Sequence, residues 1–355
     1  MSEVKRRDSS IELFRIISML IIVAHHYVVN SGLMDTIASN STTWNSIFLL
    51  LFGWGGKTAI NCFVFITGYF MCQSNITWKK FLKLFLEFKF YKIVFYLVFF
   101  VTGYTEFSIK ELWEIIFPIN SIGSGFVGSY LAFYLFIPFV NLLITSMSEK
   151  MHQRLIALCI CLFTVLPTFF FTNVKLSYVS WFITLYLIAA YVRLYPKRIF
   201  DNRKVWGIAL FVSLLLSWCS VIAGIYVGRW IGKDITYYFV ADSNKALALV
   251  TSFCAFLFFK NLNMGYNRCI NTIAASSFGV LLIHANSDIM RTWLWQDVCQ
   301  NTSFYGNKLL ILHAVGTVLV IYIVCTCIDI LRIKYLEKPF FGWLDKKFSV
   351  KEKGD

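Results

Sequence analysis

The chain alternates between long apolar runs and short polar segments. Ten of the apolar runs approach the length of about 20 residues that a helix needs to cross the hydrocarbon core of a bilayer. We therefore predict an all-α fold, a polytopic helical membrane protein with about ten transmembrane helices. The predicted spans lie near residues 11–31, 54–73, 86–103, 126–146, 155–172, 178–194, 205–228, 245–260, 271–289 and 309–331.

The composition supports this class. Hydrophobic residues make up 58% of the chain and charged residues only 15%. A soluble protein of 355 residues would need more charge to cover its surface. The composition therefore excludes an ordinary soluble enzyme and makes the lipid bilayer the first expected partner.

The basic residues predict the orientation. If the N-terminus is cytoplasmic, the inner segments hold most of the 33 Lys and Arg residues, as cytoplasmic loops normally do. An even number of spans then places both termini inside, in a multi-pass protein of the plasma membrane. The net charge of +14 is spread over many short loops, which argues for attraction to lipid and against nucleic-acid binding.

The chain is predicted to have one large unit. We expect residues 1–335 to form a transmembrane domain and residues 336–355 to form a short basic cytoplasmic tail. The first apolar run carries charged and titratable residues and lacks a small-residue cleavage site after it, so it is expected to stay in the protein. The oligomeric state cannot be predicted from the sequence.

The first predicted span contains the strongest functional signal. Arg15 and His26 are eleven residues apart, so on a helix they lie within about 20° of one face. They are separated by about 16 Å along the axis. Because ionisable groups inside a membrane are costly, they normally face a polar interior or pathway. We predict that His26 is a catalytic residue and that Arg15 lines the same polar path.

Two neighbours of this pair are weaker candidates. Glu12 is predicted to pair with Arg15, and its alternative role is that of a carboxylate favoured at a helix N-terminus. His25 lies about 100° around the helix from His26, so the two cannot share a role. We assign His25 to the surroundings of the site.

Polar residues elsewhere leave more alternatives open. His284 and Asp288 are one helical turn apart, and the carboxylate would orient the histidine; a polar patch at the outer membrane surface is an equally good interpretation. Trp293 and Trp295 are expected at the outer interface as aromatic-belt residues. Lys57, Lys89 and Lys92 fall inside or at the ends of spans.

The basic cluster at the start of an inner helix is expected to bind phosphates or to anchor the helix at the membrane surface: Lys79, Lys80 and Lys83.

The sequence lacks complete motifs for nucleotide binding, disulfides or metal sites. The segment Gly55–Thr58 resembles the end of a phosphate-binding loop but lacks its first glycine. The closely spaced cysteines point to opposite sides of their helices, so we expect small core side chains there rather than a disulfide or metal site. We predict no metal site and no bound cofactor.

Five segments in order resemble the acyltransferase-3 family of integral-membrane acyltransferases. The Arg–ten residues–His pattern of the first span is the mark of this family. Asn61 and Thr67 stand where the second pattern often has Asp and Ser, Leu281 stands where a Tyr is usual, and Lys80 and Lys83 match an Arg-x-x-Arg pair. The five segments are RDSSIELFRIISMLIIVAHHY at 7–27, GGKTAINCFVFITGYF at 55–70, GSYLAFYLFIPFVN at 128–141, SSFGVLLIH at 276–284 and YLEKP at 335–339.

The resemblance implies a reaction. Within the family, the chain looks most like short members from Gram-positive bacteria that O-acetylate capsular or exported polysaccharides. The donor would be cytoplasmic acetyl-CoA, bound near Lys79, Lys80 and Lys83. The acceptor would be a hydroxyl of a polysaccharide or lipid-linked oligosaccharide, with Asn61, His284 and Asp288 near it. His26 would act as a general base or carry the acetyl group transiently.

A transporter or flippase of a glycan precursor is the alternative function. Ten helices with buried charge would also suit such a protein. That interpretation lacks evident paired halves in the sequence, and it does not use the shared face of Arg15 and His26.

Overall fold

The structure is a computed structural model that describes residues 8–74, 76–116, 125–172 and 177–351, and every regular element in these ranges is helical. Parts of five predicted segments lie outside the described residues: the N-terminal basic residues, residue 75 of an inner loop, the outer loop near 117–124, residues 173–176 of the next outer loop and the end of the tail. The α-helices are α1 (Ser9–Val29), α2 (Leu33–Ser39), α3 (Trp44–Gly53), α4 (Gly56–Met71), α5 (Trp78–Val101), α6 (Ile109–Ile116), α7 (Gly125–Ser146), α8 (Glu149–Ile160), α9 (Leu166–Phe169), α10 (Tyr178–Leu194), α11 (Arg203–Ile231), α12 (Ala246–Lys260), α13 (Arg268–Ala275), α14 (Ser277–His284), α15 (Asp288–Thr292), α16 (Leu310–Arg332) and α17 (Lys338–Lys351).

Several helices have the length and composition of membrane spans. Six helical segments of the described chain meet both requirements, and a bent pair running from α13 to the segment after α15 makes a possible seventh. Helices α10 and α12 are apolar but shorter, and α5 is interrupted by charged residues. The prediction of an all-α multi-pass membrane protein is confirmed at this level. The number of ten spans and the sides of the two termini stay predictions.

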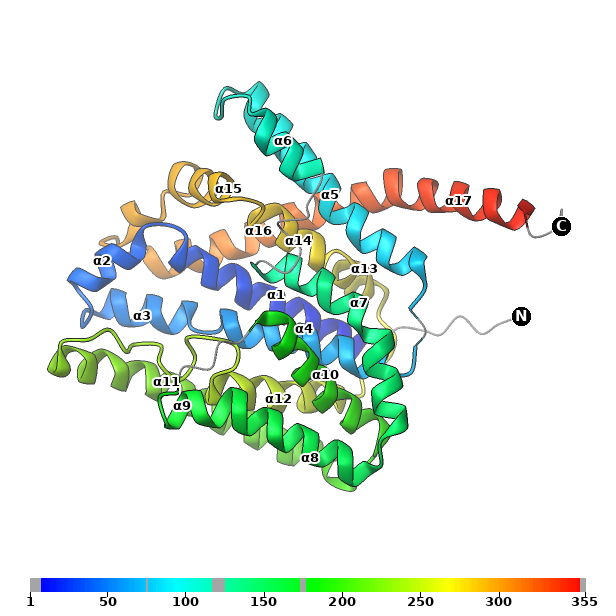
Figure 1. Cartoon of the computed structure of the whole chain (residues 1–355). Coiled ribbons are helices and arrows are strands. Elements are labelled where there is room, and N and C mark those ends of the chain that lie inside the picture. Colours follow the sequence, from blue (N-terminus) through cyan, green and yellow to red (C-terminus); the bar gives the residue numbers. More distant parts are fainter. Residues whose placement is uncertain (1–7, 75, 117–124, 173–176, 352–355) are drawn as a thin grey trace.

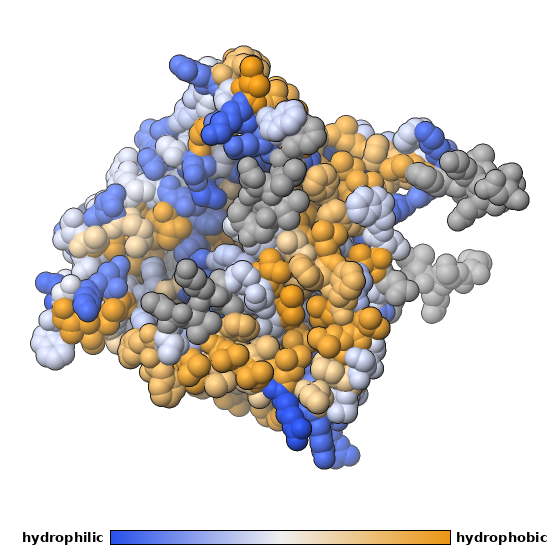
Figure 2. Space-filling view, in the orientation of Figure 1, coloured by the Kyte–Doolittle hydropathy of each residue, from blue (hydrophilic) through white to orange (hydrophobic). Residues whose placement is uncertain are grey.

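The sides of the helix bundle are suited to contact with lipid. Large apolar side chains are exposed along α7, α11 and α16, among them Phe139, Ile208 and Leu312. Figure 2 shows a continuous hydrophobic surface over α7, with hydrophilic residues gathered toward the end of the molecule where α2 and α15 lie. In water such a surface would be unfavourable, and in a bilayer it is the expected exterior.

Helix α1 lies at the centre of the bundle (Figure 1). It packs against α3, α4, α12, α13, α14 and α16. Asp8 caps its start by accepting a hydrogen bond from the backbone N–H of Ser10. We call the end of the bundle at which α1 finishes the outer end, following the predicted topology, and the opposite end the inner end.

Two of the predicted spans are broken. Helix α3 ends at Gly53 and α4 starts at Gly56, so the span that includes residues 54–73 is a broken helix that begins at Trp44. The predicted span near 271–289 is not one continuous helix. It is divided at Ser276, it ends at His284, and the following segment turns away by 96°.

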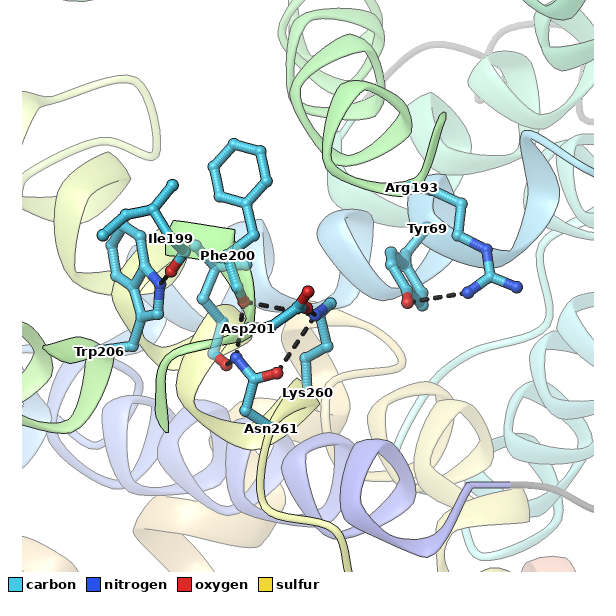
Figure 3. Close-up of polar contacts among 9 residues, drawn as sticks. Tyr69, Arg193, Ile199, Phe200, Asp201, Trp206, Lys260 and Asn261 are labelled. Carbon is cyan, nitrogen blue, oxygen red and sulfur yellow. Dashed lines mark hydrogen bonds and ion pairs between the residues drawn. The ribbon is translucent and has the colours of Figure 1, made fainter. Parts of the chain in front are cut away.

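Polar contacts fasten the inner loop between α10 and α11 (Figure 3). Asn261, which follows α12, donates to the backbone carbonyl of Phe200 at 2.7 Å, and Lys260 contacts the Asp201 carboxylate at 2.7 Å. Trp206 donates from its ring nitrogen to the carbonyl of Ile199 at 2.7 Å. The backbone carbonyl groups of this loop have no hydrogen-bond partner within a helix, and these contacts supply one. The contacts also hold the start of α11 in place.

The chain beyond the last long span remains helical. Helix α16 passes through a π-helical turn into α17, which carries the region predicted as a basic tail. The start of α1 and all of α17 lie toward the same side in Figure 1.

The topology can be tested with two glycines that have open space for a side chain. Gly306 lies in a predicted outer loop and Gly265 in a predicted inner loop, and a Cβ at either meets nothing within 4 Å. In a background without native cysteines, Gly306→Cys should react with a membrane-impermeant maleimide in intact cells. Gly265→Cys should react only after permeabilisation. Labelling of Gly265→Cys in intact cells would overturn the predicted orientation.

Candidate functional site

A cavity of about 510 Å³ opens at the outer end of the bundle. It lies where α1 finishes and where α4, α7 and α10 begin, so side chains from several helix ends converge on it. Apolar residues such as Ile22, Ile60 and Phe88 form part of its wall. Its polar lining consists of His25, His26, Asn30, Lys57, Lys92, Tyr178, Asn286 and Arg291.

One histidine of this lining contacts a histidine from a distant part of the chain, which is buried behind the cavity wall. His26 Nδ1 lies 2.9 Å from Nε2 of His284, and His284 Nδ1 lies 2.6 Å from the carbonyl oxygen of Val280. A carbonyl only accepts, so His284 Nδ1 carries the proton, and Nε2 of the neutral ring is the acceptor. His26 therefore donates from Nδ1, and its Nε2 keeps a free lone pair. That is the form a general base or nucleophile requires.

The position of His284 is fixed by its surroundings. Its side chain is fully buried, and the ring of Trp295 packs edge-on against it with 6.3 Å between ring centroids. Trp295 is itself buried and also contacts Tyr27 of α1. The prediction that Trp295 is an aromatic-belt residue is therefore wrong, because the bend after α14 returns it to the core; Trp293 is partly exposed.

His25 makes a different contact. Its Nδ1 donates to the carbonyl of Gly53 at 2.6 Å. This carbonyl is at the end of α3, where the helix break removes the usual backbone partner. His25 lines the cavity, but its ring is used to close the break between α3 and α4.

Glycines allow α1 to approach this break. A Cβ on Gly55 would lie 2.5 Å from Ile21, and a Cβ on Gly56 would lie 2.3 Å from the ring of His25. Such distances exclude a larger residue without movement of α1. The glycine pair of the rejected phosphate-loop motif thus has a packing role.

Arg15 and Glu12 lie together near the inner end of α1. Arg15 Nε is 3.3 Å from the Glu12 carboxylate, and Glu12 is buried. Arg15 does not belong to the described lining of the cavity that holds His26. The pair is present as expected, on the inner side of the histidines.

Two other candidates lie away from His26. Asp288 does not share a helical face with His284, because α14 ends at His284 and the chain turns. Asp288 instead pairs with Arg291 at 2.7 Å, and its side chain is 95% exposed. Asn61 is buried outside the cavity, where it donates to the carbonyl of Ser243 and accepts from the Trp181 ring. In this structure Asn61 connects α4, α10 and the segment before α12.

A second cavity, of about 750 Å³, lies at the inner end. The predicted basic cluster lines it. Lys79 contacts Asp345, Lys83 contacts Glu337 at 2.6 Å, and Lys80 donates to Ser74. The same cavity has four further cations that sequence reasoning did not assign to it: Arg268, Arg332, Lys334 and Lys338.

A buried ion cluster adjoins the inner cavity. Arg332 reaches Glu87 at 3.0 Å, Asp329 at 2.7 Å and Glu337 at 2.9 Å. Tyr91 donates to Asp329 at 2.8 Å. The cluster joins α5 to α16 and to the turn before α17. Charges at such depth are tolerated only when they are paired and hydrogen bonded.

Sequence reasoning missed part of the outer cavity. Lys57 and Lys92 were visible as cations within apolar helices, which is a functional signal in a membrane protein. Arg291 and Trp295 gave no such signal, because the chain turn that brings them to His284 has no clear sequence mark.

Comparison with known proteins gives one match. The acyltransferase-3 family model (Acyl_transf_3), described as an acyltransferase domain, matches residues 8–330. No curated protein and no solved structure matches the chain significantly.

The close packing beside the cavity predicts a stability effect. Gly56→Ala should lower the stability of the fold by about 1–3 kcal/mol, because the new methyl group meets the His25 ring. The melting temperature of the detergent-solubilised protein measures this. Gly316→Ala is the control, since a Cβ there meets nothing within 4 Å. Equal melting temperatures for the two variants would contradict the packing of α1 on α4.

Proposed function

The chain belongs to the acyltransferase-3 family, and from this premise we propose that it transfers an acetyl group from acetyl-CoA to a hydroxyl of an exported polysaccharide or of its lipid-linked precursor. The family match supports a membrane acyltransferase in general. The donor, the acceptor and the residue roles are our proposal.

The hydrogen-bonded pair of His26 and His284 supports the proposal most directly. His26 lines a cavity that is open at the outer end, and its second nitrogen is held in the wall by His284. In this arrangement His26 Nε2 is free to accept a proton from a hydroxyl group. In many hydrolytic enzymes a carboxylate orients the histidine base. Here the Val280 carbonyl and His284 together would orient His26.

The inner cavity is the proposed donor site. Acetyl-CoA carries several phosphate groups, and the inner cavity is lined by seven cations. Three carboxylates, Glu87, Glu337 and Asp345, also line it and neutralise some of this charge. Lysine binds phosphate as a compact point charge rather than through a bidentate fork.

The proposed chemistry needs only one active nitrogen. The acceptor hydroxyl attacks the thioester carbonyl while its proton passes to His26 Nε2, the C–S bond breaks, and the proton leaves with the CoA thiolate as a thiol. In the second route, Nε2 attacks the thioester carbonyl, the C–S bond breaks and CoA leaves as the thiolate. The hydroxyl then attacks the acetyl group, the N–C bond to Nε2 breaks, and the hydroxyl proton ends on the CoA thiolate by way of Nε2. Both routes use the tautomer that His284 selects.

Substitution of the histidines tests their roles. His26→Ala should reduce acetyl transfer by about 10²–10⁴-fold, the usual loss when a general base is removed. Arg15→Ala should also abolish transfer, since it lies on the same face of α1 toward the donor. His25→Ala should be milder, because His25 holds the helix break. Transfer from labelled acetyl-CoA, expressed per folded molecule, is the measurement.

The outcome separates catalysis from packing. His284→Ala should lower the maximal rate without abolishing it, because His26 remains present but loses its fixed tautomer. If His26→Ala keeps full activity per folded molecule while His25→Ala is inactive, the assignment of the base is wrong.

Substitution of the inner lysines tests the donor site. Lys80→Ala and Lys83→Ala should raise the KM for acetyl-CoA more than they lower kcat, as expected for residues that hold phosphates throughout the reaction. Lys204→Ala removes an exposed inner charge that lies outside the cavity and should leave KM unchanged. An unchanged KM in the Lys80 and Lys83 variants would instead make these residues membrane anchors.

A further inference from the structure

The outer cavity has a strongly one-sided charge. Lys57 of α4, Lys92 of α5 and Arg291 of α15 line it together with His26, and there is no Asp or Glu among its described lining residues. Three cations of three separate helices therefore surround the proposed base. Ionisable groups are rare at such positions and normally have a functional role.

Lys57 is held at the cavity by a phenol. Its Nζ donates to the Tyr178 hydroxyl at 2.6 Å, and Tyr178 is also a lining residue. The nearest described carboxylate is that of Asp242, 3.7 Å away and 53% exposed. A half-exposed partner at this distance cancels only part of the lysine charge.

Lys92 has no carboxylate partner among the described residues. Its Nζ donates to the backbone carbonyl of Asn286, and no carboxylate of the described chain lies within salt-bridge distance of it. Glu111 and Glu114 line a smaller cavity of about 250 Å³ on the other side of Lys92, not the cavity of His26. Among the described residues, Arg291 has only the exposed Asp288 as an ion partner.

Unpaired donors add a second observation. Arg291 Nε and Asn30 Nδ2 are buried at the cavity wall and have no hydrogen-bond acceptor among the described residues. A buried donor without an acceptor costs about 1–3 kcal/mol. Both groups can only donate, so the missing partner is an acceptor.

We propose that the acceptor substrate is anionic, with a carboxylate or phosphate group bound between Lys57, Lys92 and Arg291 close to the hydroxyl that receives the acetyl group. The inference rests on the proposed acetyl transfer and specifies its acceptor. A cavity lined by one sign of charge and by apolar walls concentrates counter-ions and orients them. A neutral sugar would leave the charge of three cations only partly compensated beside the reacting hydroxyl.

The anion has two possible sources, a uronic acid of the glycan or the phosphate of a lipid carrier, and the experiment separates them. The purified full-length protein in lipid vesicles is given labelled acetyl-CoA and glycan from cells that produce the protein, after mild alkaline removal of existing acetyl groups. One portion of the glycan has its carboxylates reduced to alcohols. A lipid-linked portion is tested before and after mild acid release from its carrier.

Each result has a defined meaning. A loss of acetylation of at least tenfold after carboxylate reduction supports the glycan anion, and an equal loss after release from the carrier supports the phosphate. Acetylation that survives both treatments overturns the anionic acceptor and leaves the acetyl transfer intact. If no portion is acetylated and no CoA is released, the proposed function itself fails, and the inference fails with it.

Variants of the cavity lysines provide an independent test, measured with the glycan portion that is acetylated. Lys92→Gln and Lys57→Gln should each raise the KM for the acceptor at least tenfold without changing the KM for acetyl-CoA. Lys92→Arg should restore most of the affinity, which a merely structural role for the side chain would not predict. Lys308→Gln, in an exposed outer segment, is the matched control. An unchanged acceptor KM in both glutamine variants would contradict the proposal.

Discussion

The arrangement of the site depends on one hydrogen bond between imidazole rings. A neutral histidine donates from one nitrogen and accepts at the other, so a bond at one position determines the role of the second. The Val280 carbonyl determines the proton position on His284, and His284 determines that on His26. The bond joins residues 258 positions apart in the chain, and it forms only because α1 is central and α14 ends beside it. The broken helices are therefore part of the chemistry: the break of α3–α4 accommodates His25, and the end of α14 presents His284.

Charge divides the molecule into two regions. The inner cavity has many cations but also carboxylates, and the Arg332 cluster beside it is paired from three directions. The outer cavity has fewer cations, and these have weak or no carboxylate partners. The inner region resembles a stable site for a polyanionic donor at the membrane surface. The outer region has a deficit of negative charge that a ligand would fill, and under the proposed function this difference would let the protein bind two different substrates.

Part of this architecture was predictable from residue patterns. The length of the apolar runs indicated a helical membrane protein, and helical periodicity selected His26 in preference to His25. The broken spans were not predictable, because Gly53, Gly55 and Gly56 only show their purpose once α1 is packed against them. The same limit applies to Asp288. Spacing along an ideal helix placed it beside His284, whereas the helix ends at His284 and directs it toward solvent. Contacts across long sequence separations, such as that of His284 with His26 or of Trp295 with His284, have no local signature.

The buried ion cluster has a consequence for how the protein is made. Asp329 and Arg332 lie in the last turn of α16, at the inner end of the bundle, where an unpaired charge would be unfavourable in an isolated membrane helix. The Glu87 partner of Arg332 is on α5, which is synthesised more than two hundred residues earlier. The ion pair between them can form only when both helices are in the membrane, so this buried contact joins an early part of the chain to a late one.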